Sequence, residues 1–282
     1  MRTMKLSLGL LFCVAAFGQK EVDPKEWKEL FNGKNLDGWI VKINGYEVGD
    51  NFGDTFRVHD GVIQVSYDKY PEFGKRFSHL FYKQKFSHYR LSMEYRFYGE
   101  QVKDGPSYAR LNSGVMVHSQ APESILKDQD WPISVEAQFL GNDGNLQRHT
   151  MNVCTPGTDI YMNGELVKVH CVNSSSKIYR GDGWVKVEVE VLGSERVRHI
   201  IDGVTVLQYE KPQIGGGVAT GYDSKIKIDG KLLTEGYIGL QSESHPVEFR
   251  NIRLLNLSGC MDRKAKNYKD YFVHNDAAGC VY

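Results

Sequence analysis

The segment from Ile133 to Phe139 alternates apolar and polar residues and thereby groups two chemically useful side chains. Every second residue from Ile133 onward is apolar, so Glu136 and Gln138 fall together on the opposite face of the expected strand. They lie about 7 Å apart along it. A carboxyl and an amide at this spacing could hold sugar hydroxyls, ligate a cation or move a proton. The competing interpretation is an ordinary row of polar side chains that faces solvent.

A second short strand is expected to contribute a histidine. Asn112 opens the segment, and alternation from Val115 to Val117 places His118 on the face opposite these valines. Histidine titrates near neutral pH, so His118 could serve as a general base. Asn112 could fix a sugar hydroxyl or orient a loop. The alternative for His118 is a hydrogen-bonded histidine at the surface.

Other segments offer side chains for the walls of such a site. Two of these side chains come from the loop directly after the Glu136 strand, and two others share one face of a later strand. The fifth is a tryptophan, which could stack on a sugar ring or simply pack. These substrate-binding candidates are Arg148, His149, Gln241, Glu243 and Trp131. Sequence alone does not establish that the later strand lies near Glu136.

Charge and motif searches exclude several function classes. The chain carries 35 basic and 35 acidic residues, and the near-neutral balance argues against nucleic acid or an anionic membrane as the main partner. It contains no G-x-S-x-G, H-E-x-x-H, P-loop, strand-associated G-x-G-x-x-G or EF-hand pattern. Serine hydrolases, zincins, NTPases and nucleotide-dependent dehydrogenases are therefore disfavoured.

The first 18 residues have the organisation of a cleaved signal peptide. Arg2 and Lys5 precede an apolar run, and small residues near Gly18 predict cleavage before Gln19. The run is shorter than the ~20 residues needed to span a bilayer. Lipidation of Cys13 is the alternative, disfavoured because a bulky residue precedes it. We expect a periplasmic or secreted protein without membrane insertion.

Four cysteines remain after this leader: Cys154, Cys171, Cys260 and Cys280. An even number in an exported chain favours disulfides. Of the three connectivities, we expect the local pairs Cys154–Cys171 and Cys260–Cys280. A zinc site is the alternative, but no pair has close C-x-x-C spacing.

The remaining pattern predicts an all-β fold with very little helix. Many short alternating segments, joined by turns such as Asp60-Gly61 and Asp202-Gly203, favour an antiparallel sandwich or jelly roll over residues 19–258. The longest helical candidate is Pro24 to Leu30. Long connections at 98–112, 119–131 and 141–183 are expected to line a site or form lids.

Residues 259–282 form a small tail bounded by cysteines and poor in aliphatic residues. It is too short to build its own core and should depend on its disulfide. It resembles small modules at the ends of many exported Bacteroidetes-type proteins. The resemblance implies an accessory role without chemistry.

Six motifs in order resemble the 3-keto-disaccharide hydrolase domain family across residues 30–257. They are LFNGKNLDGW (Leu30–Trp39), FRV with Asp60-Gly61 (Phe56–Gly61), NSGV (Asn112–Val115), VEAQ (Val135–Gln138), GLQ (Gly239–Gln241) and FRNI (Phe249–Ile252). The resemblance implies a concanavalin A-like jelly-roll sandwich of two antiparallel sheets, one of them concave. It also implies an oligosaccharide or glycoside substrate with a C3-oxidised sugar, and functional coupling to a sugar C3 oxidoreductase.

The chemistry implied by this resemblance begins with a ketone at C3, which acidifies the C2 proton. A base removes that proton, the C1 glycosidic oxygen leaves, and water adds to the resulting enone. His118 or Glu136 would be the base, while Gln138 or Asn112 would orient hydroxyls. A divalent metal held by Glu136 and a histidine is an open alternative. Two other functions also remain open. One is a conventional glycoside hydrolase, which is disfavoured because Gln138 stands where a second acid is expected. The other is a non-catalytic carbohydrate-binding module.

Overall fold

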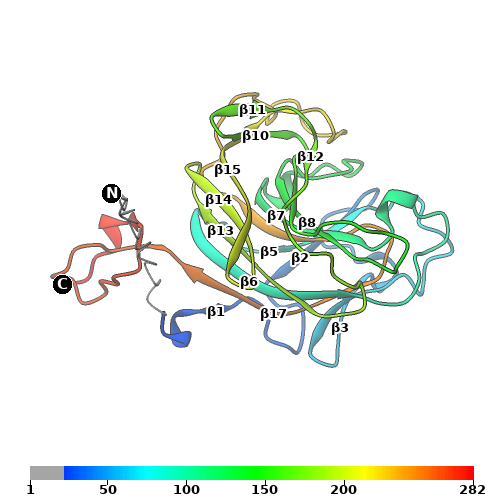
Figure 1. Ribbon diagram of the computed structural model, residues 1–282, viewed down its shortest axis with the longest axis horizontal. Helices are drawn as coiled ribbons and strands as arrows, with labels where there is room; N and C mark the ends of the chain where they lie inside the picture. Colours follow the sequence, from blue (N-terminus) through cyan, green and yellow to red (C-terminus); the bar gives the residue numbers. More distant parts are fainter. Residues whose placement is uncertain (1–21) are drawn as a thin grey trace, which may run out of the picture.

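The computed structural model describes residues 22–282 and shows two large antiparallel sheets packed against each other (Figure 1). The predicted signal peptide and its cleavage site lie outside the described residues. The ten-stranded sheet runs in the order β11 (Glu165–Val167), β10 (Thr158–Met162), β15 (Val204–Ile214), β14 (Arg196–Ile201), β13 (Val185–Leu192), β6 (His88–Phe97), β17 (Val247–Asn256), β4 (Val62–Val65), β3 (Phe56–His59), with β1 (Lys28–Glu29) pairing with β17.

The second sheet has seven strands and carries the motifs singled out above. Its order is β12 (Cys171–Val172), β9 (Asn152–Cys154), β8 (Val135–Leu140), β7 (Asn112–Ser119), β16 (Tyr237–Ser242), β5 (Ser78–Tyr82), β2 (Trp39–Ile43). The described residues contain short 3₁₀ turns and no α-helix: η1 (Pro24–Glu26), η2 (Phe52–Asp54), η3 (Ser107–Ala109), η4 (Pro122–Ser124) and η5 (Ala277–Gly279). The predicted all-β sandwich with very little helix is confirmed.

The hydrophobic core fills the space between the two sheets. Every second residue of β6 points inward, and Tyr95 stacks on Phe139 of β8 with ring centroids 4.3 Å apart. Both side chains are almost fully buried, so this contact couples the sheets by apolar burial and ring packing together. The outward residues Glu94 and Arg96 pair across strands, with Arg250 and Glu248 respectively.

Both predicted Asp-Gly hairpins are present. Asp60 and Gly61 join β3 to β4, and Asp202 and Gly203 join β14 to β15. All four residues have positive φ, between 47° and 76°, as the type I′ hairpin turn requires. The register of these strand pairs is therefore fixed locally by the turn.

The predicted helix from Pro24 to Leu30 is wrong. Only one 3₁₀ turn forms, capped by the Asp23 carboxylate, which accepts the Lys25 N–H at 3.0 Å. Lys28 and Glu29 then pair with β17, so sheet hydrogen bonds replace the second helical turn. No helix in the described part of the chain is long and apolar enough to cross a membrane.

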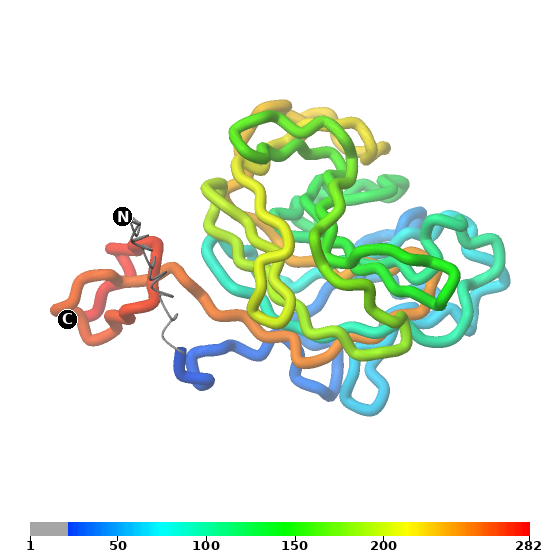
Figure 2. The backbone as a smooth tube through the Cα atoms, in the orientation of Figure 1, coloured from blue at the N-terminus to red at the C-terminus, as the bar shows by residue number. Residues whose placement is uncertain are grey.

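The C-terminal segment is set apart at one end of the molecule, shown in red in Figure 2. Its strands β18 (Ser258–Gly259) and β19 (His274–Asn275) form a separate parallel pair. Disulfides join Cys260 to Cys280 in this segment and Cys154 to Cys171 between β9 and β12. Both predicted pairings are confirmed.

Candidate active site

A hollow of about 460 Å³ lies on the face of the seven-stranded sheet that is turned away from the core. Its volume is within the usual range of small-molecule sites, about 300–1,000 Å³. Six of the nine predicted site residues line it: Asn112, Trp131, Glu136, Gln138, Arg148 and Glu243. The alternation of β8 places Glu136 and Gln138 there, because Val135, Ala137 and Phe139 are buried between the sheets.

Glu136 is the most deeply placed acid of this hollow. Its side chain is 5% exposed and lies over Gly114 of β7, where an added Cβ would come within 2.8 Å of Glu136 Cγ. Only glycine leaves that space. Glu136 Oε1 is buried and has no hydrogen-bond partner among the described residues. Burial, and secondarily the neighbouring Glu243, raise the pKa of Glu136 well above its ordinary value.

Glu243 supplies a second carboxyl just beyond the end of β16. Burial raises its pKa to about 8, and the nearby Arg148 partly offsets this effect. The bend that delivers Glu243 is fixed by Tyr67, whose hydroxyl accepts the Ser244 N–H at 2.7 Å and shares a hydrogen bond with Ser242. The two carboxyls of the hollow therefore favour their protonated forms at neutral pH.

Arg148 and Asn112 add polar groups to the same wall. The Arg148 guanidinium donates to the main-chain oxygens of Arg110 at 2.5 Å and Leu111 at 3.2 Å, while its buried Nε has no partner among the described residues. Asn112 donates to the Tyr108 carbonyl at 3.4 Å, and its Oδ1 likewise has no partner there. Buried polar atoms are nearly always paired, so these orphans indicate a place for ligand groups.

Gln138 and Trp131 are fixed by protein contacts. Gln138 Oε1 accepts a hydrogen bond from Asn152 Nδ2 at 3.0 Å. The Trp131 ring packs on Phe77 with centroids 4.5 Å apart. The amide of Gln138 therefore has its NH₂ available for a ligand oxygen, and Trp131 presents part of its ring to the hollow.

The structure corrects the predicted placement of His118 beside Glu136. His118 has a φ of 51°, and the pairing of β7 with β16 shifts register at this point, so the alternation breaks there. The ring is buried, and its Nε2 lies 3.0 Å from the carbonyl oxygen of Gly193, which follows β13 in the other sheet. His118 does not line the hollow.

His149 and Gln241 also lie outside the hollow. His149 Nδ1 is 2.5 Å from the Ser176 carbonyl, which turns the ring toward its own loop. Gln241 is 1% exposed and stands opposite His79 of β5 in the sheet register. Neither residue forms part of the predicted wall: the His149 ring is turned to its own loop, and the buried Gln241 Oε1 has no hydrogen-bond partner among the described residues.

Sequence reasoning missed Tyr108, His170 and the disulfide as parts of the wall. Cys154 stands directly opposite Glu136 in the sheet, so the bond from Cys154 to Cys171 brings the preceding His170 to the hollow. Burial lowers the pKa of His170, and its Nδ1 has no partner among the described residues. The predicted disulfide alone did not place His170, because the strand register that sets Cys154 opposite Glu136 is a long-range pairing.

The described residues do not offer a three-ligand metal site that includes Glu136. The one close group of potential ligands found in residues 22–282 is Cys154, His170 and Cys171. Both thiols are consumed in the disulfide, so this group does not fit a thiolate-bound metal.

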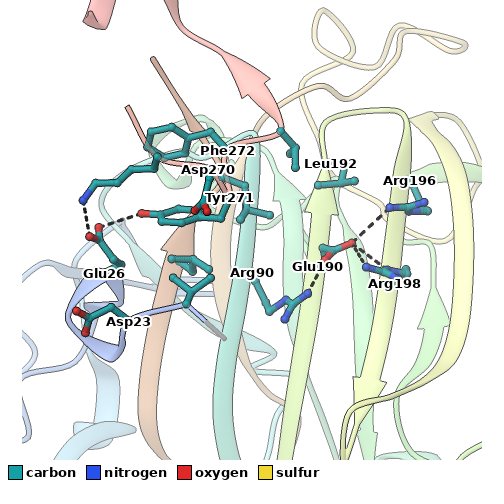
Figure 3. A pocket seen from close by; sticks show the side chains of 15 residues that line it. Asp23, Glu26, Arg90, Glu190, Leu192, Arg196, Arg198, Asp270, Tyr271 and Phe272 are labelled. Carbon is teal, nitrogen blue, oxygen red and sulfur yellow. Dashed lines mark hydrogen bonds and ion pairs between the residues drawn. The ribbon is translucent and has the colours of Figure 1, made fainter. Parts of the chain in front are cut away.

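A larger hollow of about 580 Å³ lies on the outer face of the ten-stranded sheet, beside the C-terminal segment (Figure 3). At its wall Glu190 accepts hydrogen bonds from Arg90 and Arg198, both at 2.9 Å, and Arg196 is 3.7 Å away. Burial favours protonation, but these arginines outweigh it and lower the pKa of Glu190. The carboxylate is thus held ionised by ion pairs, as in a structural cluster.

The sequence of motifs, the sandwich and the polar hollow agree with one family. A model of the 3-keto-alpha-glucoside-1,2-lyase-like domain matches residues 26–255. The chain belongs to this family. The 3-keto-alpha-glucoside-1,2-lyase-like domain thus covers both large sheets and places the chain among carbohydrate-active proteins.

Several solved structures are similar to this member of the 3-keto-alpha-glucoside-1,2-lyase-like family. A candidate glycosyl hydrolase from Parabacteroides distasonis is 19% identical, with a TM-score of 0.49 over 82% of this chain and 99% of that one. The carbohydrate-binding module CBM66 from Bacillus subtilis is 12% identical, with a TM-score of 0.43 over 76% and 93%. No curated protein sequence matches the chain.

Proposed function

We propose that this protein is an exported enzyme, periplasmic or secreted, that cleaves glycosides whose sugar carries a ketone at C3. The observation that carries the proposal is the buried pair Glu136 and Glu243, both with raised pKa values, in a hollow with orphaned polar atoms. Family membership supports the carbohydrate substrate class. The C3 ketone is supplied by a sugar oxidoreductase acting before this enzyme.

The first step is removal of the C2 proton by ionised Glu136. Its raised pKa makes that carboxylate a stronger base than an ordinary one, and the adjacent ketone makes the proton acidic. The electron pair of the C2–H bond forms an enolate on the C3 oxygen. Arg148 lines the hollow and its Nε lacks an acceptor among the described residues, so we assign it to donate to the developing negative charge.

The second step breaks the bond between C1 and the glycosidic oxygen. The enolate electrons form the C1=C2 double bond, and the leaving oxygen takes a proton from Glu243, which is largely protonated at neutral pH. Water then adds across the double bond, with its hydroxyl on C1 and a proton returned to C2. The net reaction is hydrolysis, and no oxidant or reductant is consumed.

A conventional glycoside hydrolase is the second candidate, since Glu243 is the additional carboxyl that the sequence pattern did not place. Such enzymes combine a proton donor with an ionised nucleophile or base. Both reactions need one protonated and one ionised carboxyl, so the raised pKa values of Glu136 and Glu243 suit the proton donor of either reaction. The match to the 3-keto-alpha-glucoside-1,2-lyase-like domain is what favours the ketone-dependent reaction.

One assay separates these functions. The protein is incubated with trehalose, cellobiose and a simple glucoside, and with the 3-keto form of each, and sugar release is followed by chromatography. We expect release from the keto forms alone. Release from the unoxidised sugars as well would establish a conventional glycosidase, and binding without release would establish a carbohydrate-binding module.

A further inference from the structure

A second hollow of about 520 Å³ adjoins the candidate active site. The two hollows share Tyr108 and Trp131, which line both. Tyr108 is 55% exposed, so it stands at the common rim. A substrate longer than one sugar ring can therefore occupy both spaces at once.

The Tyr108 hydroxyl connects the two hollows electrostatically. Burial raises its pKa, and two carboxyl groups add to this effect: Glu243 in the first hollow and Asp130 in the second. Glu243, the proposed proton donor for the leaving oxygen, lines the first hollow together with Tyr108, which also lines the second. The group attached to that oxygen would extend past Tyr108.

The second hollow has an aromatic side. Trp131 packs on Phe77, and Phe77 packs edge-to-face on Phe73 with centroids 5.0 Å apart. All three line this space. Aromatic faces bind flat apolar surfaces, including the C–H faces of sugar rings and other rings of similar size.

The rim of the second hollow, unlike its aromatic side, carries acidic side chains. Asp104, Asp128 and Asp130 line the space, against the single cation Lys75. Asp130 is fixed, because its carboxylate accepts the Thr220 N–H and hydroxyl, each at 2.7 Å. The excess of carboxylates disfavours an anion in this space.

Two further lysines lie near these acids but face elsewhere. Lys42 interacts with Asp128, yet its ammonium already donates to the carbonyls of Ile43, Tyr46 and Lys127 at 2.9–3.1 Å. Lys103 is 3.9 Å from Asp104, and its side chain is 71% exposed, so water screens that pair. Neither is among the residues that line the second hollow.

We propose that this second hollow is the leaving-group subsite, which accepts neutral or cationic ring-bearing groups and rejects anionic ones. This inference rests on the proposed function, because a leaving group exists only if the enzyme cleaves glycosides. Trp131 supplies the surface on which the group lies, and the rim aspartates accept hydrogen bonds from hydroxyl or ammonium groups. Tyr108 and Trp131 are specificity-determining residues.

The test uses three benzyl 3-keto-glucosides that differ only at the para position: aminomethyl, hydroxymethyl or carboxylate. We expect kcat/KM for the first two to exceed that for the carboxylate by at least about tenfold at low salt. Replacing both Asp104→Asn and Asp128→Asn should shrink that ratio. Asp60→Asn, at an exposed hairpin turn outside both hollows, is the matched control and should preserve it.

Failure of the subsite and failure of the function give different results. Cleavage of all three compounds at similar rates overturns the subsite and leaves the function standing. Cleavage of none overturns the function; the subsite is then judged by tryptophan fluorescence titration with free 4-(aminomethyl)benzyl alcohol and 4-(hydroxymethyl)benzoate, with Trp131→Phe as the control. Tighter binding of the amine supports the subsite, and equal binding or no binding overturns it.

Discussion

Two glutamates of this protein are nearly equally buried and yet held in opposite charge states. Glu136 is 5% exposed and Glu190 is 4% exposed. Burial, and secondarily the neighbouring Glu243, raise the pKa of Glu136. Glu190 lies among arginines that donate to it, so its pKa falls. Burial favours the protonated form of both carboxyls, and the arginines around Glu190 reverse that effect there. A site for proton transfer needs an environment like that of Glu136, where the carboxyl can be protonated. A structural ion pair needs an environment like that of Glu190, where cations keep the carboxylate ionised.

The largest effect should come from Glu136→Gln. The substitution keeps the size of a side chain that favours its neutral form, but it removes the base. Turnover of a 3-keto-glycoside should fall by at least about 100-fold, while the thermal unfolding temperature stays near that of the wild type. Glu188→Gln, on the outer face of the other sheet, is the control. Unchanged turnover in Glu136→Gln would remove this residue from the chemistry.

Glu190→Gln should lower the stability of the protein and leave its activity unchanged, the reverse of what is expected for Glu136→Gln. It leaves the arginines of that wall without their shared carboxylate, and breaking a buried ion pair on one side costs about 3 kcal/mol of unfolding free energy. Urea denaturation at constant pH measures this loss, and activity per folded molecule should be retained. Glu188→Gln should change stability by less than about 0.5 kcal/mol. Equal stabilities would show that the arginine cluster is not structural.

The two environments should also differ in how they respond to pH. Glu243 titrates near pH 8 in the folded protein and near 4.5 when unfolded, so the folded state binds the extra proton between these values. Stability contributed by this group is complete below about pH 4.5 and is lost as the pH rises toward 8. Glu243→Gln should remove roughly 3 kcal/mol of the decline between pH 5 and 7. Parallel curves for both proteins would contradict the raised pKa.

The smallest expected effect is a displaced pH–rate profile. The charge of Glu243 helps to raise the pKa of Glu136, so Glu243→Gln should lower that pKa. The rising limb of kcat/KM, which reports the base of the free enzyme, should move to lower pH even as the maximal rate falls. A limb that stays in place would show that the two carboxyls do not interact.

Local rules predicted the parts of this site that lie on regular strands. Alternation in β8 correctly grouped Glu136 with Gln138, and Asp-Gly turns fixed two hairpins. The same rule failed at His118, because a bulge with positive φ interrupts β7 there. A bulge depends on the partner strand, which a period-2 pattern does not reveal.

Other features depend on contacts between distant segments. Glu243 meets Glu136 because β16 lies next to β7, and β7 next to β8, an order that the sequence does not state. The helix expected from Pro24 to Leu30 gave way to pairing with β17, more than 200 residues away. His170 reached the hollow through the covalent link at Cys171. The sequence therefore did not reveal which distant segments pair with one another.

The link between Cys154 and Cys171 joins neighbouring strands at the wall of the hollow, with His170 next to it. Thiol oxidation therefore adds a covalent bond to this wall, and reducing cytosol opposes that oxidation. Material folded there would lack the covalent closure of the 155–170 loop. Maturation of the pocket is in this way tied to the compartment in which the chain finishes folding, and preparations for enzymology need an oxidising folding step.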